Sequence, residues 1–223
     1  MVLARFKDLV MDAADPAVSG AFWKAAAGLE WVPLREGEGE LTGPTPRHTI
    51  WIDRVPEPKT VKNRVHLDVY ARSIAALEGL GAERVEEFPD WSVMRDVEGG
   101  EFCAFLREEP PRDRLHALVV DSADPRAQAD WWADVYGAEA VHHREEGWSA
   151  VEGVPDMPVR SFDFVRVPEP KRVKNRIHWD VYGDVDDLAA AGARVLRDRD
   201  EEISWTVMAD PEGNEFCVFT SDV

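Results

Sequence analysis

The feature that most constrains this chain of 223 residues is that its sequence repeats itself. Four blocks recur in the same order, at separations of 109 to 114 residues. The paired blocks are Asp12 to Pro16 with Asp121 to Pro125, Val55 to Lys59 with Val167 to Lys171, Lys62 to Tyr70 with Lys174 to Tyr182, and Glu98 to Cys103 with Glu212 to Cys217. Matched blocks in one order indicate a tandem duplication.

The two copies meet in a short segment rich in charge and proline. Arg107 to Arg114 contains two consecutive prolines among acidic and basic residues, a composition typical of an exposed linker. We therefore expect one domain over residues 1–110 and a second over residues 111–223.

Within each half the hydrophobic pattern alternates between strand and helix periodicity. In the second half a helix is expected to begin at Asp124-Pro125 and end at Gly137, because Asp is a favoured N-cap and Gly a favoured C-cap. The other elements expected in this half are strands at Leu115 to Val120, Ser161 to Val167, Arg176 to Tyr182, Ile203 to Met208 and Glu215 to Thr220, and a helix at Asp184 to Ala191. This order predicts an α+β fold in which each half contains two βαβββ units and forms a cupped mixed sheet with helices outside.

Composition and charge narrow the class of partner. Lys and Arg total 26 against 44 Asp and Glu, so the net charge is -18, which disfavours nucleic acid and anionic membrane surfaces. No window approaches the ~18 apolar residues of a membrane span, and Met1 to Asp12 has no secretory core. We expect a cytoplasmic monomer or homodimer that binds a small molecule.

Three motifs together resemble the vicinal oxygen chelate superfamily. They are Asp-Pro before a Phe/Trp-rich helix, Asn-Arg-Val/Ile-His, and Glu-Gly-x-Glu-Phe-Cys, and they occur in both halves. The superfamily includes glyoxalases, bleomycin-resistance proteins and extradiol dioxygenases, and this chain is most similar to its glyoxalase-like branch. The resemblance covers nearly the whole chain but implies no particular reaction.

The resemblance implies a metal site built from four strands facing a cup. In the second half the matching positions are His116, Asp163, His178 and Glu215. Two imidazoles and two carboxylates suit Zn, Ni, Co, Mn or Fe. In a glyoxalase-type isomerisation, Glu215 or Asp163 would also move a proton.

The first half departs from this pattern. Its equivalent residues are Lys7, Trp51, His66 and Glu101. A lysine ammonium and an indole cannot ligate a metal ion at neutral pH. We therefore expect a degenerate, metal-free first half in which Lys7 pairs with Glu101.

A simpler interpretation of several residues remains open. His66 and His178, like Glu101 and Glu215, occur in both halves, so shared packing or capping of backbone amides explains them without a metal. The Lys-Asn-Arg motifs are expected to fix the strand entrance through charge pairs with local carboxylates, and binding of an anionic substrate is the alternative. The residues expected to line the pocket of the second half are Trp205, Met208 and Cys217.

Two functions follow from these residues. One is a divalent-metal-dependent isomerase or lyase that acts on a small oxygenated metabolite. The other is a metal-free protein that binds or sequesters a small molecule in its cup. Ring-cleaving dioxygenation is disfavoured, because the second half offers Trp205 where a pocket tyrosine would be needed and no histidine in Ser161 to Val167.

Overall fold

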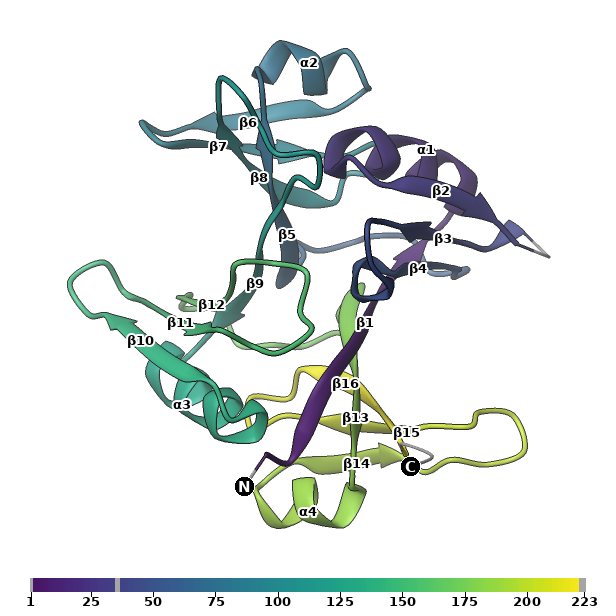
Figure 1. The fold of residues 1–223 in the computed structure, drawn as a ribbon, viewed down its shortest axis with the longest axis vertical. Coiled ribbons are helices and arrows are strands. Elements are labelled where there is room, and N and C mark those ends of the chain that lie inside the picture. Colours follow the sequence, from purple (N-terminus) through teal and green to yellow (C-terminus); the bar gives the residue numbers. More distant parts are fainter. Residues whose placement is uncertain (1, 35–36, 221–223) are drawn as a thin grey trace.

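The computed structural model describes residues 2–34 and 37–220, which form two curved eight-stranded sheets with four helices (Figure 1). The first βαβββ unit is β1 (Ala4–Ala13), α1 (Pro16–Ala27), β2 (Glu30–Pro33), β3 (Gly39–Thr42) and β4 (Ile50–Arg54), with the 3-10 turn η2 (Pro46–His48) before β4. The second is β5 (Val65–Ala71), α2 (Ile74–Glu78), β6 (Glu83–Glu87), β7 (Trp91–Arg95) and β8 (Glu101–Leu106). The third is β9 (Leu115–Ser122), α3 (Pro125–Tyr136), β10 (Glu139–His143), β11 (Trp148–Glu152) and β12 (Ser161–Arg166). The fourth is β13 (Ile177–Gly183), α4 (Val185–Ala190), β14 (Arg194–Arg197), β15 (Thr206–Ala209) and β16 (Glu215–Phe219).

Each sheet combines one unit from each half. Sheet A has the order β14-β15-β16-β13-β1-β4-β3-β2, so it joins the fourth unit to the first. Sheet B has the order β10-β11-β12-β9-β5-β8-β7-β6, so it joins the third unit to the second. The α+β class with two βαβββ units per half and mixed sheets is confirmed, and strands of both halves build each cup.

The capping residues place the long helices as the sequence predicts. Asp15 and Asp124 accept hydrogen bonds from backbone N–H groups of the first turns of α1 and α3. The helices end at Gly28 and Gly137, which have φ of 72° and 63°. Glycine adopts this left-handed conformation without a Cβ clash, so both helices stop where the strands must turn back.

The helices cover a core that is continuous across the molecule. In the first half, Trp23 of α1 packs against Phe102 of β8 with ring centroids 5.3 Å apart. In the second half, Trp132 of α3 packs against Phe216 of β16 at 5.2 Å. Each long helix therefore contacts the other unit of its own half, while the sheets join the halves to each other.

The Lys-Asn-Arg motifs connect the halves: their lysines form charge pairs, but with carboxylates of the opposite half and not with the local ones that the sequence predicts. Lys62 pairs with Asp121 at 2.6 Å, and Lys174 pairs with Asp12 at 2.7 Å. In addition, Arg64 donates to the carbonyl of Glu169, and its counterpart in the second half makes the reciprocal bond to the first half. These bonds hold the entrances of β5 and β13 against the opposite half.

Two details differ from the sequence prediction. The strand expected at Ile203 to Met208 is shorter and later, since β15 spans Thr206–Ala209. Met208, expected in the pocket, is fully buried in the core, because it lies three residues from Trp205 and faces the opposite side of the sheet. Among the described residues, no helix is long and apolar enough to cross a membrane.

Candidate metal centre

The four residues predicted as one metal site lie in two different sheets. His116 of β9 and Asp163 of β12 belong to sheet B, whereas His178 of β13 and Glu215 of β16 belong to sheet A. The prediction that all four converge in one cup is therefore wrong. It failed because the strands that complete each cup come from the other half of the chain.

Because each sheet combines one unit from each half, the four residues predicted as the degenerate site of the first half also lie in two different sheets. Lys7 and Trp51 lie in sheet A with His178, and His66 and Glu101 lie in sheet B with His116. The predicted pair of Lys7 with Glu101 is wrong for the same reason.

The two glutamates hold loops in place. Glu101 accepts from Lys59 Nζ and from the backbone N–H of Asn63, each at 3.0 Å. Glu215 is bound in the same way by Lys171 at 2.6 Å and by the N–H of Asn175 at 3.1 Å. Burial alone would raise the pKa of Glu101, but these hydrogen bonds and the lysine lower it below its usual value. The capping interpretation thus accounts for both residues.

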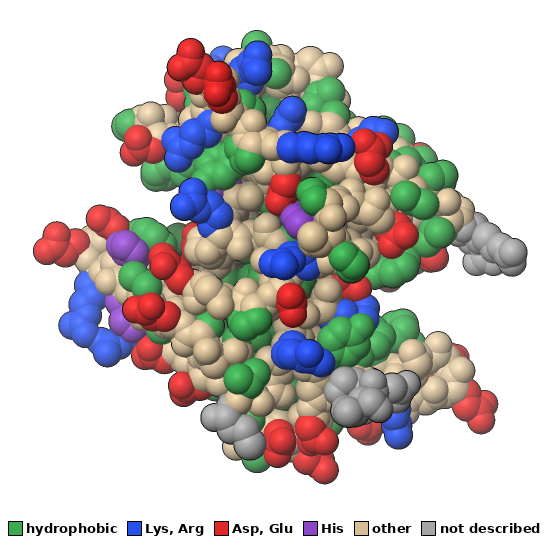
Figure 2. All heavy atoms as spheres, viewed as in Figure 1, with side chains coloured by type: hydrophobic (Ala, Val, Ile, Leu, Met, Phe, Trp, Pro, Cys, Tyr) green, Lys and Arg blue, Asp and Glu red, His purple; other side chains and the backbone are tan. Residues whose placement is uncertain are grey.

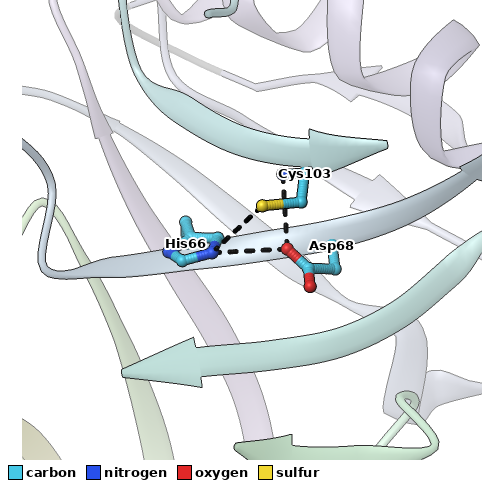
Figure 3. A group of neighbouring side chains, drawn as sticks. All are labelled: His66, Asp68 and Cys103. Carbon is cyan, nitrogen blue, oxygen red and sulfur yellow. Dashed lines mark hydrogen bonds and ion pairs between the residues drawn. The ribbon is translucent and has the colours of Figure 1, made fainter. Parts of the chain in front are cut away.

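Three potential ligands meet on the concave face of sheet B (Figure 3). His66 and Asp68 are two residues apart on β5 and share a face, and Cys103 lies beside Asp68 on the parallel strand β8. His66 Nε2 is 3.3 Å from Asp68 Oδ1 and 3.8 Å from Cys103 Sγ. One nitrogen, one oxygen and one sulfur therefore lie within 4.8 Å of one another.

Two further side chains face the same concave surface of sheet B. His66 and Asp163 both lie opposite Val119 in the strand register, so imidazole and carboxyl stand on either side of one small residue. His116 occupies a bulge of β9, with its ring 4.5 Å from that of Tyr70. Asp163 Oδ1 and His116 Nδ1 are buried and lack hydrogen-bond partners. Both atoms are free to bind something placed in the cup.

Burial and charge shift the pKa values of three groups in this cup, each in the direction that favours its neutral form. Burial raises the pKa of Asp163 to about 7, and the nearby charge of Asp68 adds to the effect. Burial also lowers the pKa of His116, so its imidazole is neutral at pH 7. Burial and Asp68 raise the pKa of the Cys103 thiol, which is therefore protonated unless a cation binds it.

Sheet A contains an equivalent triad, but the ammonium group of a lysine lies beside it. His178, Asp180 and Cys217 match the triad of sheet B and also lie within 4.8 Å of one another. At the bulge that His116 occupies in sheet B, sheet A has Lys7, whose Nζ is 2.5 Å from Asp8 and 3.7 Å from Asp180. The partners of Lys7 are thus two aspartates of sheet A, where the sequence predicted Glu101.

The acidic groups on the concave face of sheet B form no ion pair with a lysine or arginine of the described residues. Among the described residues, Asp68 forms an ion pair only with His66, and Asp163 forms none. Two carboxyl groups thus share one cup without such an ion pair, and the arginines that act on this cup, Arg160 and Arg107, lie on the side of His116. A buried carboxylate without a counter-charge is costly, so burial favours the protonated form of Asp163.

Sequence reasoning missed three residues of this cup. Asp68 could have been found, because it follows His66 by two and its counterpart follows His178 by two. Cys103 could have been found as the counterpart of Cys217 in the repeat, since Cys217 was expected to line a pocket. Tyr70 was missed because the search for a pocket tyrosine was confined to the second half, so the argument against ring cleavage loses one of its supports.

Comparisons with known proteins agree with this architecture. The sequence profile of the family described as "Glyoxalase-like domain" matches residues 8–105 and again residues 117–219. A comparison with curated protein sequences found no match.

Solved structures share the fold at low sequence identity. Glyoxalase I from Zea mays is 12% identical with a TM-score of 0.68, and the alignment covers 97% of this chain and 92% of that one. A putative dioxygenase from Bacillus subtilis is 16% identical with a TM-score of 0.64, covering 100% and 86%. Identities this low establish the fold alone. Because the family profile accounts for most of the chain, once in each half, this protein belongs to the glyoxalase-like domain family.

Proposed function

We propose that this chain binds one divalent transition-metal ion in the cup of sheet B and acts there as an isomerase or lyase on a small oxygenated metabolite. The observation that carries the proposal is the cluster His66, Asp68 and Cys103 with Asp163 beside it, in which neither carboxyl group forms an ion pair with a lysine or arginine of the described residues. Sheet A supports it as an internal comparison, because there Lys7 occupies the corresponding place.

The available donors fit a borderline or soft divalent ion. Imidazole, carboxylate and thiolate are the ligands of Zn, Co, Ni and Fe, whereas Mg and Ca prefer oxygen alone. His66, Asp68 and Cys103 would hold the ion, and His116 and Asp163 would stand beside it, facing the substrate. A bound ion would polarise adjacent substrate oxygens and stabilise an enolate.

Proton transfer falls to the residues around the triad. Asp163, with a pKa raised to about 7 by burial, can accept and return a proton at neutral pH. His116 is a neutral imidazole with a free Nδ1 that can hydrogen-bond a substrate oxygen. We assign no catalytic role to Glu215, because it lies in sheet A with both oxygens engaged.

The end of the cup near His116 favours an oxygen-rich, partly anionic substrate. Arg160 Nη1 is 3.4 Å from the Tyr70 hydroxyl, and Arg107 lies over the same ring at 5.1 Å. Neither arginine forms an ion pair with a described residue. Together they offer positive charge to a carboxylate or enolate oxygen beside an aromatic wall.

Metal analysis with matched variants tests the proposal. The wild-type protein should carry about one equivalent of transition metal per chain, measured by plasma mass spectrometry after purification or after titration of chelator-treated protein. His66→Ala should weaken this binding by roughly 100-fold or more, since it removes a ligand and its support. The control is His178→Ala, the same change at the same strand position of sheet A, which should leave the stoichiometry unchanged.

Two results would contradict this assignment. If His178→Ala removes the metal and His66→Ala does not, the site lies in sheet A. If wild-type protein binds no transition metal even on titration, the enzyme proposal fails.

A further inference from the structure

The concave face of sheet A lines a cavity. The metal site proposed in sheet B does not use it. The volume of this cavity is about 890 Å³, and its walls come from β1, β4, β13, β15 and β16. Figure 2 shows the molecule hollowed on the right of the view, with hydrophobic side chains gathered at the lower edge of the hollow. A volume of this size falls in the range of small-molecule pockets.

Aromatic and aliphatic side chains form one wall of this cavity. Trp205 stacks on Phe219 with ring centroids 5.4 Å apart, and Ile203 and Leu196 line the cavity next to them. Leu196 is 42% exposed, so part of this apolar wall is open to solvent. This wall offers the flat and apolar surface that an aromatic or aliphatic group requires.

The cavity already holds one ammonium group against an aromatic face. Lys7 Nζ lies 4.2 Å from the centre of the Phe219 ring, while its hydrogen bond goes to Asp8. Such an arrangement is a cation–π contact, and it places positive charge where carboxylates converge. Lys7 thus shows that an ammonium group can lie against the face of Phe219 while its charge is paired by Asp8.

The lysines of the cavity are paired with other carboxylates, which leaves Asp53 without a basic partner among the described residues. Lys7 is taken by Asp8 and Asp180, and Lys174 by Asp12. Asp53 forms no hydrogen bond or ion pair with a described residue. Burial and the neighbouring Glu38 raise its pKa to about 6, so that it is largely ionised at pH 7.

The basic groups at the rim do not neutralise Asp53. Arg197 is bound by Asp200 and Glu202, and Arg54 donates to the carbonyl of Ala14. Lys174 acts on Asp53 only from a distance. The cavity thus has an acidic group free for a ligand beside its apolar wall.

A buried polar atom provides independent evidence for a missing partner. Asp180 is 4% exposed and lines the cavity; its Oδ1 lies 3.8 Å from His178 Nε2 but has no hydrogen-bond partner among the described residues. An unpaired buried oxygen costs free energy unless a ligand or water satisfies it. Asp53 at the side and Asp180 at the floor would then both accept from the polar end of a ligand.

We propose that the cavity of sheet A is a second, metal-independent site that binds a small organic cation, namely an amine on an aromatic or aliphatic body. Asp53 is its counter-ion, Asp180 Oδ1 accepts from its N–H group, and Trp205 with Phe219 packs against its apolar part. The site is independent of the metal centre in sheet B, because the residues of the two cups belong to different sheets.

Isothermal titration calorimetry on the chelator-treated full chain tests this site with two probes of matched size. Phenethylamine is the cationic probe and 3-phenylpropionate the anionic one. The wild-type protein should bind the amine saturably and bind the acid more weakly. Asp53→Asn, which preserves shape but removes the charge, should weaken amine binding by roughly tenfold. The control Asp198→Asn makes the same change in net charge at an exposed residue outside the cavity and should leave the affinity unchanged.

A second variant separates the aromatic wall from the charge. Trp205→Ala should weaken the amine while circular dichroism remains that of the wild type, since Trp205 is only partly buried. Absence of saturable amine binding would overturn the proposal. So would tighter binding of 3-phenylpropionate, or equal effects of Asp53→Asn and Asp198→Asn.

Discussion

At the residue scale, the two cups differ in charge because one pair of equivalent positions holds a histidine in sheet B and a lysine in sheet A. His116 and Lys7 occupy matching bulges, one in β9 and the other in β1. A lysine brings its own positive charge to the aspartates, whereas a neutral histidine leaves them without one. The sequence could identify both residues, since Lys7 and His116 differ where the repeats otherwise agree. It could not identify their neighbours, because those come from the opposite half.

The raised pKa of Asp163 predicts how the stability of the metal-free protein depends on pH. The folded chain favours the protonated form, so this contribution to stability is full below the unfolded pKa near 4 and is lost as the pH rises through about 7. Asp163→Asn should therefore stabilise the chelator-treated protein by roughly 2–4 kcal/mol at pH 8 and by much less at pH 4.5. Urea denaturation of both proteins at the two pH values measures the difference. An equal effect at both would show that Asp163 titrates normally.

At the element scale, the periodicity and capping signals predicted most of the structure. Asp124 and Gly137 correctly marked the ends of α3, because both act through local backbone geometry. The predicted start of β15 was less accurate than its end, since Ile203 and Trp205 are loop residues that line the cavity of sheet A. Local patterns specify an element, but the length of a strand depends on the strand beside it.

The glutamates that anchor the loops give a prediction at this scale. Glu101→Gln removes the charge that Lys59 and the Asn63 N–H bind, which should lower the free energy of unfolding by about 1–3 kcal/mol. Glu215→Gln should have a similar cost, because its contacts are the same. Chemical denaturation gives the stability, and metal analysis of the same samples should show no loss. Lost metal with unchanged stability would instead identify Glu101 as a ligand.

At the scale of the whole molecule, the exchange of units between halves is the feature that the sequence could not reveal. The repeats make β5 and β13 nearly identical in pattern, so β1 could pair with either on local grounds. The observed pairing of β1 with β13 depends on tertiary contacts spread over both halves. The duplication was therefore predictable, whereas the composition of each cup was not.

This exchange predicts that the halves do not fold separately. A fragment of residues 1–110 would expose the edges of β1 and β5 that pair with the other half. It should aggregate or self-associate, and the intact chain should unfold in a single calorimetric transition. Co-expression with residues 111–223 should restore a soluble complex. Two separate transitions, or a monomeric folded fragment, would show that each half is an autonomous domain.

The most direct test of the metal centre is the transition-metal content of His116→Lys beside that of the wild type. The substitution gives sheet B the residue that sheet A has in Lys7, so the new ammonium should pair with Asp68 and occupy the cation's place. We predict about one equivalent of metal for the wild type and almost none for His116→Lys, with unchanged circular dichroism. Two equivalents in the wild type, or undiminished metal in His116→Lys, would contradict the assignment.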